Sequence, residues 1–234
     1  MEPWEQACTS CAIVERTGEG FRFSPGFGSV TGKAMRAFLF DIGNVLVRLE
    51  FSRGLRAAAA LSDVKDEQEV LARINDVKLA YEDGQMPRAD FLREAMALLR
   101  FRGAEAEFIA AWQGIFSANE PMHALVRRLH GKYPLYLLSN TNCLHVDGLL
   151  RDFPIFECFA AGTYSHVAQA SKPHDAIYEI ACRAHGLVPK ETFFIDDLAD
   201  NIATARRLGF QAHQYRLDRH QDLLAALDAA GWEY

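Results

Sequence analysis

The feature that most constrains this 234-residue chain is a run of four apolar residues, 37–40 (AFLF), followed at once by Asp41. Four apolar residues without polar alternation are too few for a helix and are typical of a parallel strand buried on both faces. Gly43 and Asn44 tolerate unusual backbone angles, so the chain can turn sharply and leave the Asp41 carboxylate facing outward. Open α/β sheets bind their ligands at this edge.

Two later apolar runs, residues 135–138 and 192–195, have the same form and also end on polar side chains. These side chains are Ser139 and Asn140 after the first run, and Asp196 and Asp197 after the second. If the strands are parallel, their carboxyl ends meet at one sheet edge. This edge would then gather a carboxylate, a hydroxyl and a carboxylate pair.

A basic side chain comes between these two runs. Lys172 precedes Pro173, where a helical pattern begins. Proline suits the first helical position, so Lys172 would lie just outside the helix. A lysine at the rim of an acidic cluster is more often paired than solvated. The pattern therefore predicts an anion site that can also hold a cation.

The remaining pattern indicates an α/β fold with a helical insertion. Strand and helix patterns alternate after residue 119, with further strands expected near 157–161 and 211–215, which favours a parallel sheet with right-handed crossovers. Residues 52–118 show only helical periods. Residues 1–34 have no periodicity and are predicted to be a flexible extension before the fold, or an upstream start that is not used.

Four ordered segments resemble the motifs of the haloacid dehalogenase (HAD) superfamily, most closely its bacterial sugar-phosphate phosphatases, including those that act on glucose 1-phosphate. The segments are Asp41-Ile-Gly-Asn-Val, Ser139-Asn-Thr-Asn, Lys172-Pro, and Asp196-Asp197 with Asp200-Asn201. Each is weak alone, but four in this order at predicted element ends form a specific signal, and the resemblance covers about residues 35–215. It implies a Rossmann-like three-layer core (35–51 and 119–234) with a parallel sheet, and an all-helical cap (52–118).

The resemblance also implies a chemistry. Asp41 would attack phosphorus to form an aspartyl-phosphate. Mg²⁺ would be held by the Asp41 carboxylate, the Gly43 carbonyl and Asp197. Asp196 would either be the second ligand of the acidic pair or contact the residues that bind the ion. Asp200 would hold a coordinated water or simply provide negative charge at a helix start, and the sequence does not decide between these.

Other residues would bind the phosphate. The Ser139 hydroxyl and the Asn140 amide would donate to a phosphate oxygen, and Lys172 would neutralise both Asp41 and the transferring phosphoryl group. A helix start near Lys172 would add partial positive charge. For Asn142 and His145, helix capping is favoured over proton donation.

One position departs from the common phosphatase pattern. Most family phosphatases have a second Asp, an acid and base, where this chain has Gly43. Without this acid, hydrolysis should slow least for substrates with good leaving groups, such as anomeric 1-phosphates or aryl phosphates, and we expect the protein to prefer them. Equal turnover of glucose 1-phosphate and glucose 6-phosphate would contradict this hypothesis. Two alternatives stay open: a metal-independent 2-haloacid dehalogenase, and a non-catalytic protein that binds a phosphorylated metabolite.

Composition limits the classes of binding partner and the cellular compartment that we expect for this protein. A net charge of −6 argues against nucleic acid and anionic membranes, and no apolar run approaches membrane-spanning length. Five cysteines, an odd number spread among predicted helices and loops, suggest a reduced compartment. The amino terminus lacks a signal-peptide pattern, so the cytoplasm is the expected location. Cys8 and Cys11 lack a second ligand pair, so a metal site there is disfavoured. The expected partner is a small phosphate ester, bound by a monomer or a homodimer.

Overall fold

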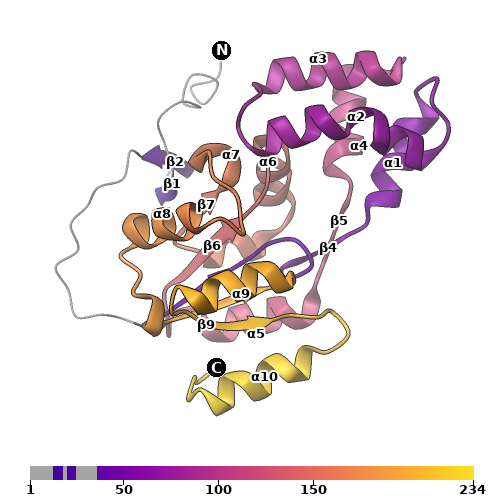
Figure 1. Ribbon diagram of the computed structural model, residues 1–234. Helices are drawn as coiled ribbons and strands as arrows, with labels where there is room; N and C mark the ends of the chain where they lie inside the picture. The colour runs from indigo at the N-terminus through magenta and orange to yellow at the C-terminus, as the bar shows by residue number, and fades with distance from the viewer. Residues whose placement is uncertain (1–12, 18–19, 25–35) are drawn as a thin grey trace.

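The computed structural model describes residues 13–17, 20–24 and 36–234, so Cys8 and Cys11 lie outside the described residues (Figure 1). Seven strands form one sheet in the order β2-β1-β7-β6-β3-β8-β9. Their bounds are β1 (Ile13–Thr17), β2 (Gly20–Ser24), β3 (Ala37–Phe40), β6 (Leu135–Ser139), β7 (Ala161–Tyr164), β8 (Thr192–Asp196) and β9 (Gln211–Gln214). The five strands β7, β6, β3, β8 and β9 are parallel to one another, which confirms the predicted parallel sheet.

The strand before Asp41 lies at the centre of this sheet. It pairs with β6 on one side and β8 on the other. Phe38 and Phe40 pack into one apolar core, and Ala37 and Leu39 pack into another. All four side chains are buried, as the unbroken apolar run predicts for a strand with helices on both faces.

Helices cover both faces of the sheet and complete a three-layer core. The core around Phe38 includes apolar residues of α5 (Glu120–Leu129), α6 (Cys143–Asp152) and α10 (His220–Ala229). The core around Leu39 includes residues of α8 (Asp175–His185) and α9 (Ala199–Arg207). Shorter helical pieces are α7 (Ser165–Ala168), η1 (Pro154–Cys158) and η2 (Pro189–Glu191). No helix in the described part of the chain is long and apolar enough to cross a membrane.

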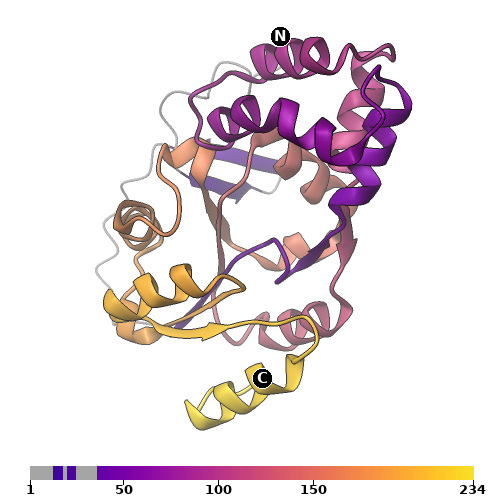
Figure 2. The ribbon, with the colours of Figure 1, turned by 45° about the vertical axis from the view of Figure 1, so that its right-hand side comes forward.

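Four further helices form a bundle with an apolar core of its own. They are α1 (Phe51–Ala60), α2 (Glu67–Glu82), α3 (Arg88–Leu99) and α4 (Glu105–Gln113). The antiparallel strands β4 (Val47–Leu49) and β5 (Phe116–Ala118) carry the chain into and out of this bundle (Figure 1). Figure 2 shows the bundle at one end of the molecule and α10 at the other. We call residues 51–113 the helical insert.

Three local predictions were wrong or incomplete. Residues 157–161 do not form the expected strand, because η1 continues through Cys158 and the strand starts only at Ala161. Pro173 is not the first helical residue: His174 donates its backbone N–H to Ser171, and this turn delays α8 until Asp175. The hairpin of β1 and β2 adds to the edge strand β7, although it comes from the segment predicted to precede the fold.

Candidate active site

The predicted site residues meet at the carboxyl ends of β3, β6 and β8. A cavity of about 280 Å³ lies there, between the sheet and the helical insert. Its walls include most of the residues singled out in the sequence: Asp41, Gly43, Ser139, Asn140, Lys172 and Asp197. Asp196 lies behind this wall, fully buried. One cavity therefore collects residues from four separate segments of the chain.

Lys172 lies at the centre of the charged cluster. Its Nζ is 2.8 Å from Asp41 Oδ1 and 2.6 Å from Asp196 Oδ2, and it also donates to the Leu138 carbonyl at 2.8 Å. Burial alone would lower the pKa of Lys172, but the two carboxylates outweigh it and the pKa is raised. Lys172 is therefore a buried ammonium ion held between two carboxylates.

Asp41 is almost completely buried, with 8% of its surface exposed. Burial raises the pKa of Asp41 to about 6; Lys172 acts in the opposite direction, and the charges of Asp196 and Asp197 add to the rise. The carboxylate is ionised at neutral pH, yet it is poorly solvated. A carboxylate in this state favours a cation or an electrophile beside it.

Asp196 has protein partners on both oxygens. Oδ1 accepts from the Leu198 backbone N–H and from Asn201 Nδ2, each at 2.9 Å, while Oδ2 accepts from Lys172. These contacts favour a role in positioning the lysine ammonium. They leave Asp197, which is only partly buried and lines the cavity, as the more open of the two carboxylates.

Asn44 is a site residue that the sequence suggested only as a turn former. It adopts a left-handed conformation (φ 53°), and its Nδ2 donates to Asp197 Oδ2 at 3.1 Å. Its Oδ1 accepts from the backbone N–H of Leu49, 3.3 Å away, in β4. Asn44 therefore joins the Asp197 carboxylate to the strand that leads into the helical insert.

The carboxylates can hold a divalent cation. Asp41, Asp196 and Asp197 each offer one oxygen, and these three oxygens lie within 4.8 Å of one another. Carboxylate oxygens are ligands that Mg²⁺ prefers, and it keeps several waters rather than requiring a complete protein cage. The residues present fit this ion.

The loop after β6 supplies neutral hydrogen-bonding groups. The Ser139 side chain is buried at the cavity wall. The Asn140 side chain makes two hydrogen bonds with the backbone of Lys172: Nδ2 donates to its carbonyl and Oδ1 accepts its N–H, each at 2.8 Å. The sequence did not indicate this second role of Asn140, which fixes the loop carrying the lysine.

Asn142 and His145 follow the capping interpretation. The Asn142 side chain accepts from the backbone N–H of His145 at the start of α6. Burial lowers the pKa of His145 to about 3, and its ring stacks on Trp112 with the centroids 5.1 Å apart. A histidine with such a pKa is neutral above about pH 4 and is poorly suited to donate a proton.

The helical insert contributes a charged pair to the roof of the cavity. Lys78 and Glu82, one turn apart on α2, form an ion pair at 2.7 Å and both line the cavity. Burial raises the pKa of Glu82, which Lys78 partly offsets. Glu82 therefore lies in the cavity wall although it is the last residue of α2. Its inward position depends on how α2 docks, which the sequence does not encode locally.

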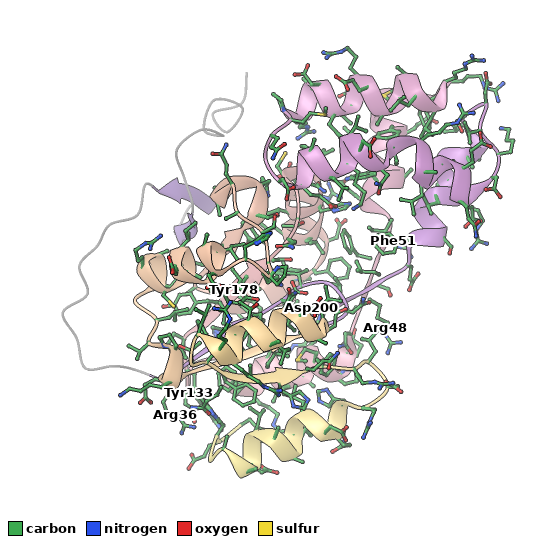
Figure 3. The ribbon with its side chains drawn as sticks, in the orientation of Figure 1. Arg36, Arg48, Phe51, Tyr133, Tyr178 and Asp200 are labelled. Carbon is green, nitrogen blue, oxygen red and sulfur yellow. The ribbon has the colours of Figure 1, made fainter. Side chains whose placement is uncertain are left out.

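Figure 3 shows where two peripheral residues lie relative to the cavity. Phe51 is at the end of α1 that faces the core, and it lines the cavity. Asp200 is exposed in the first turn of α9. This position suits a negative charge at a helix start. Whether Asp200 also holds a water remains a prediction.

The insert docks on the core through Gly84, at the end of α2. Gly84 has φ +71°, and a Cβ there would lie 2.3 Å from the His166 carbonyl oxygen. We expect Gly84→Ala to lower the free energy of unfolding by about 2 kcal/mol or more, from backbone strain plus this clash. Urea unfolding checks this.

Gly131→Ala is a matched control for this substitution. Gly131 has a similar φ of +83°, but a Cβ there would meet nothing within 4 Å. Its substitution therefore measures the cost of the left-handed backbone alone. Equal losses in the two variants would mean that the close contact between Gly84 and His166 does not matter for stability.

Comparisons with known proteins agree with this geometry. A curated relative, D-ribitol-5-phosphate phosphatase of Bacteroides thetaiotaomicron, is 24% identical over 206 residues, covering 83% of this chain and all of the relative. A HAD family enzyme of the same organism, solved with magnesium and inorganic phosphate, has a TM-score of 0.73 at 25% identity, covering 82% of this chain and 99% of that one. A predicted HAD-like hydrolase from Porphyromonas gingivalis has a TM-score of 0.72 at 26% identity, covering 86% of this chain and all of that one.

A more distant structure shares the fold alone. The L-2-haloacid dehalogenase of Xanthobacter autotrophicus has a TM-score of 0.55 at 15% identity, and the match covers 76% of each chain. The family profile described as haloacid dehalogenase-like hydrolase matches residues 35–209, which include Asp41, Ser139, Lys172 and Asp197. This match covers most of the chain, so the protein belongs to the haloacid dehalogenase-like hydrolase family.

Proposed function

We propose that this hydrolase is a magnesium-dependent phosphatase that cleaves a small phosphate monoester through an aspartyl-phosphate. The observation that carries the proposal is the arrangement around Lys172: its Nζ is 2.8 Å from Asp41, Asp197 lines the same cavity, and Asp196 lies buried behind the cavity wall. The relative whose name states a phosphatase activity and the similar structure with magnesium and phosphate support it.

The residues divide the reaction into two steps. An Asp41 oxygen attacks phosphorus, and the P–O bond to the alcohol breaks with the electron pair leaving on the alcohol oxygen, which takes a proton from solvent water. Water then attacks the aspartyl-phosphate, which releases inorganic phosphate and regenerates the Asp41 carboxylate. Lys172 offsets the negative charge in both steps, and the Ser139 hydroxyl and the backbone N–H of Asn140 donate to the phosphoryl oxygens.

Asp41, the Gly43 carbonyl and Asp197 would hold the magnesium ion, with Asp196 behind them. When bound, the ion reduces the repulsion between the Asp41 carboxylate and the phosphate. Glycine at position 43 leaves that position without an acid or base, and a Cβ there would lie 3.1 Å from Leu49. The helical insert is proposed to act as the cap that covers the substrate.

Removal of the metal tests this function against the dehalogenase alternative. With a panel of phosphate monoesters, we expect excess EDTA to abolish phosphate release and added Mg²⁺ to restore it. The same preparation should release no halide from 2-chloropropionate. Halide release that persists in EDTA would instead assign the protein as a dehalogenase, and phosphate release that persists in EDTA would contradict the metal site.

Proton competition at Asp41 predicts how metal binding depends on pH. Because the pKa of Asp41 is raised to about 6, the carboxylate is mostly protonated at pH 5 and mostly ionised at pH 7.5. Mg²⁺ binds the ionised form, so its affinity should be about tenfold weaker at pH 5. Titration calorimetry at the two pH values measures this ratio, and equal affinities would show that Asp41 is not a ligand.

A further inference from the structure

A second, smaller cavity opens within the helical insert, beside the active-site cavity. It has a volume of about 40 Å³ and lies among α1, α2 and α4. Its walls are mainly aliphatic and aromatic side chains. They include Leu55, Val70, Leu71, Ile74, Phe108 and Trp112. We call this space the apolar side cavity.

The apolar side cavity adjoins the active-site cavity. Phe51, Lys78, Ile115 and His145 line both. Phe51 and Ile115 are apolar, while His145 is uncharged at neutral pH. Lys78 forms an ion pair with Glu82, which lines the active-site cavity but not the apolar side cavity. The boundary between the two cavities is therefore formed by one charged residue with its ion-pair partner and by three uncharged side chains.

The size and lining of this space indicate what it can hold. About 10–15 Å³ on this measure is enough for one water, so 40 Å³ admits about three or four non-hydrogen atoms. A buried water needs two to four polar partners, which these walls largely lack. A hydroxyl placed there would also be left without a partner, at a cost. A short alkyl group or a ring edge fits instead.

We infer that the natural substrate is a phosphate monoester whose alcohol carries a short apolar group, which enters the apolar side cavity. The Lys78–Glu82 pair faces the part of the alcohol nearer the phosphate, where a hydroxyl can donate to the Glu82 carboxylate. A fully hydroxylated sugar alcohol would leave the apolar side cavity unused. This inference rests on the proposed phosphatase function and names its substrate class.

Two esters with the same leaving oxygen test the inference. Propane-1,2-diol 1-phosphate and hexane-1,2-diol 1-phosphate both carry a hydroxyl beside the ester and differ by three methylenes. A fully buried methylene contributes about fourfold, so three contribute about 60-fold when all are buried; with partial burial, kcat/KM for the hexane ester should still be about tenfold higher or more. Equal values, or a preference for the propane ester, would overturn the inference.

Two leucines on α2 provide a matched pair of variants. Leu71 lines the apolar side cavity and is 38% exposed, while Leu79 is 48% exposed and lines neither cavity. Both changes to Ser remove the same surface apolar group. Leu71→Ser should lower the hexane-to-propane ratio at least about threefold, because it puts a hydroxyl in the cavity wall. Leu79→Ser should leave the ratio unchanged, and equal effects of the two variants would contradict the inference.

A binding measurement separates this inference from the proposed function. Hexylphosphonate and propylphosphonate carry a phosphate-like head that cannot be hydrolysed, and calorimetry with Mg²⁺ gives their affinities. If no monoester in the panel is hydrolysed, the phosphatase proposal fails, yet the phosphonate ratio still reports on the cavity. Tenfold tighter binding of hexylphosphonate supports the apolar group, and equal affinities overturn it.

Discussion

Asp41→Asn should reduce the turnover of phosphate monoesters by about 10⁴-fold or more, with the fold intact. A carboxamide cannot attack phosphorus, and it also removes an anionic ligand from the metal site. The raised pKa of Asp41 shows that the folded protein disfavours the ionised form there. The metal-free variant should therefore be as stable as the original protein or more stable, which unfolding in urea at pH 7.5 will measure.

A surface residue provides the control for this loss. Asp152→Asn makes the same chemical change where the carboxylate is half exposed and, among the residues that the structure describes, forms an ion pair with Arg151 alone. Such a pair contributes little, so activity and stability should stay near those of the original protein. Asp41→Asn turnover above about 1% of the original rate would rule out Asp41 as the nucleophile, provided that Asp152→Asn behaves normally.

The strand ends could be predicted because sequence and structure are linked locally there. Each apolar run ends at its first polar residue, so Asp41, Ser139 and Asp196 mark the sheet edge in the sequence itself. Once the strands are parallel, their carboxyl ends have to converge. The pairing of Lys172 with Asp41 follows from this convergence and is present at 2.8 Å.

The supporting amides could not be predicted in the same way. Asn44, Asn140 and Asn201 each orient a charged residue or its backbone through the side chain. In the sequence, Asn44 looks like an ordinary turn asparagine. Asn140 and Asn201 stand in segments that resemble the family motifs, but the resemblance does not show which group each side chain holds. These roles depend on which segment lies opposite after folding.

The roof of the cavity was the least predictable part. Helical periodicity identifies the buried stripe of α2, including Val70 and Ile74, but it does not show which flank faces the core. Lys78 and Glu82 lie on that flank and look like an ordinary surface ion pair in the sequence. Gly84, two residues after Glu82, lies against the His166 carbonyl of the core, so the end of α2 that carries this pair is held at the cavity. Substrate preference therefore could not be derived from the motifs alone.

Lys172→Met should combine a large loss of stability with a loss of activity. The variant leaves Asp41 and Asp196 buried without a cation, and breaking such a pair typically costs about 3–5 kcal/mol. Without the ammonium, the pKa of Asp41 rises further above its unfolded value. The metal-free variant should therefore lose more stability at pH 8 than at pH 5, where protonation removes the uncompensated charge.

A second substitution distinguishes buried charge from lost packing. Adding Asp196→Asn to Lys172→Met removes one of the two carboxylates that have lost the ammonium, so the double variant should regain part of the stability. Its activity should stay low, because no ammonium neutralises Asp41 and the phosphoryl group. Lys132→Met, at an exposed lysine, controls for the change of side chain. If the double variant is less stable than Lys172→Met alone, the loss comes from broken packing around Leu138 and Asn201, and the charge cluster is not what Lys172 stabilises.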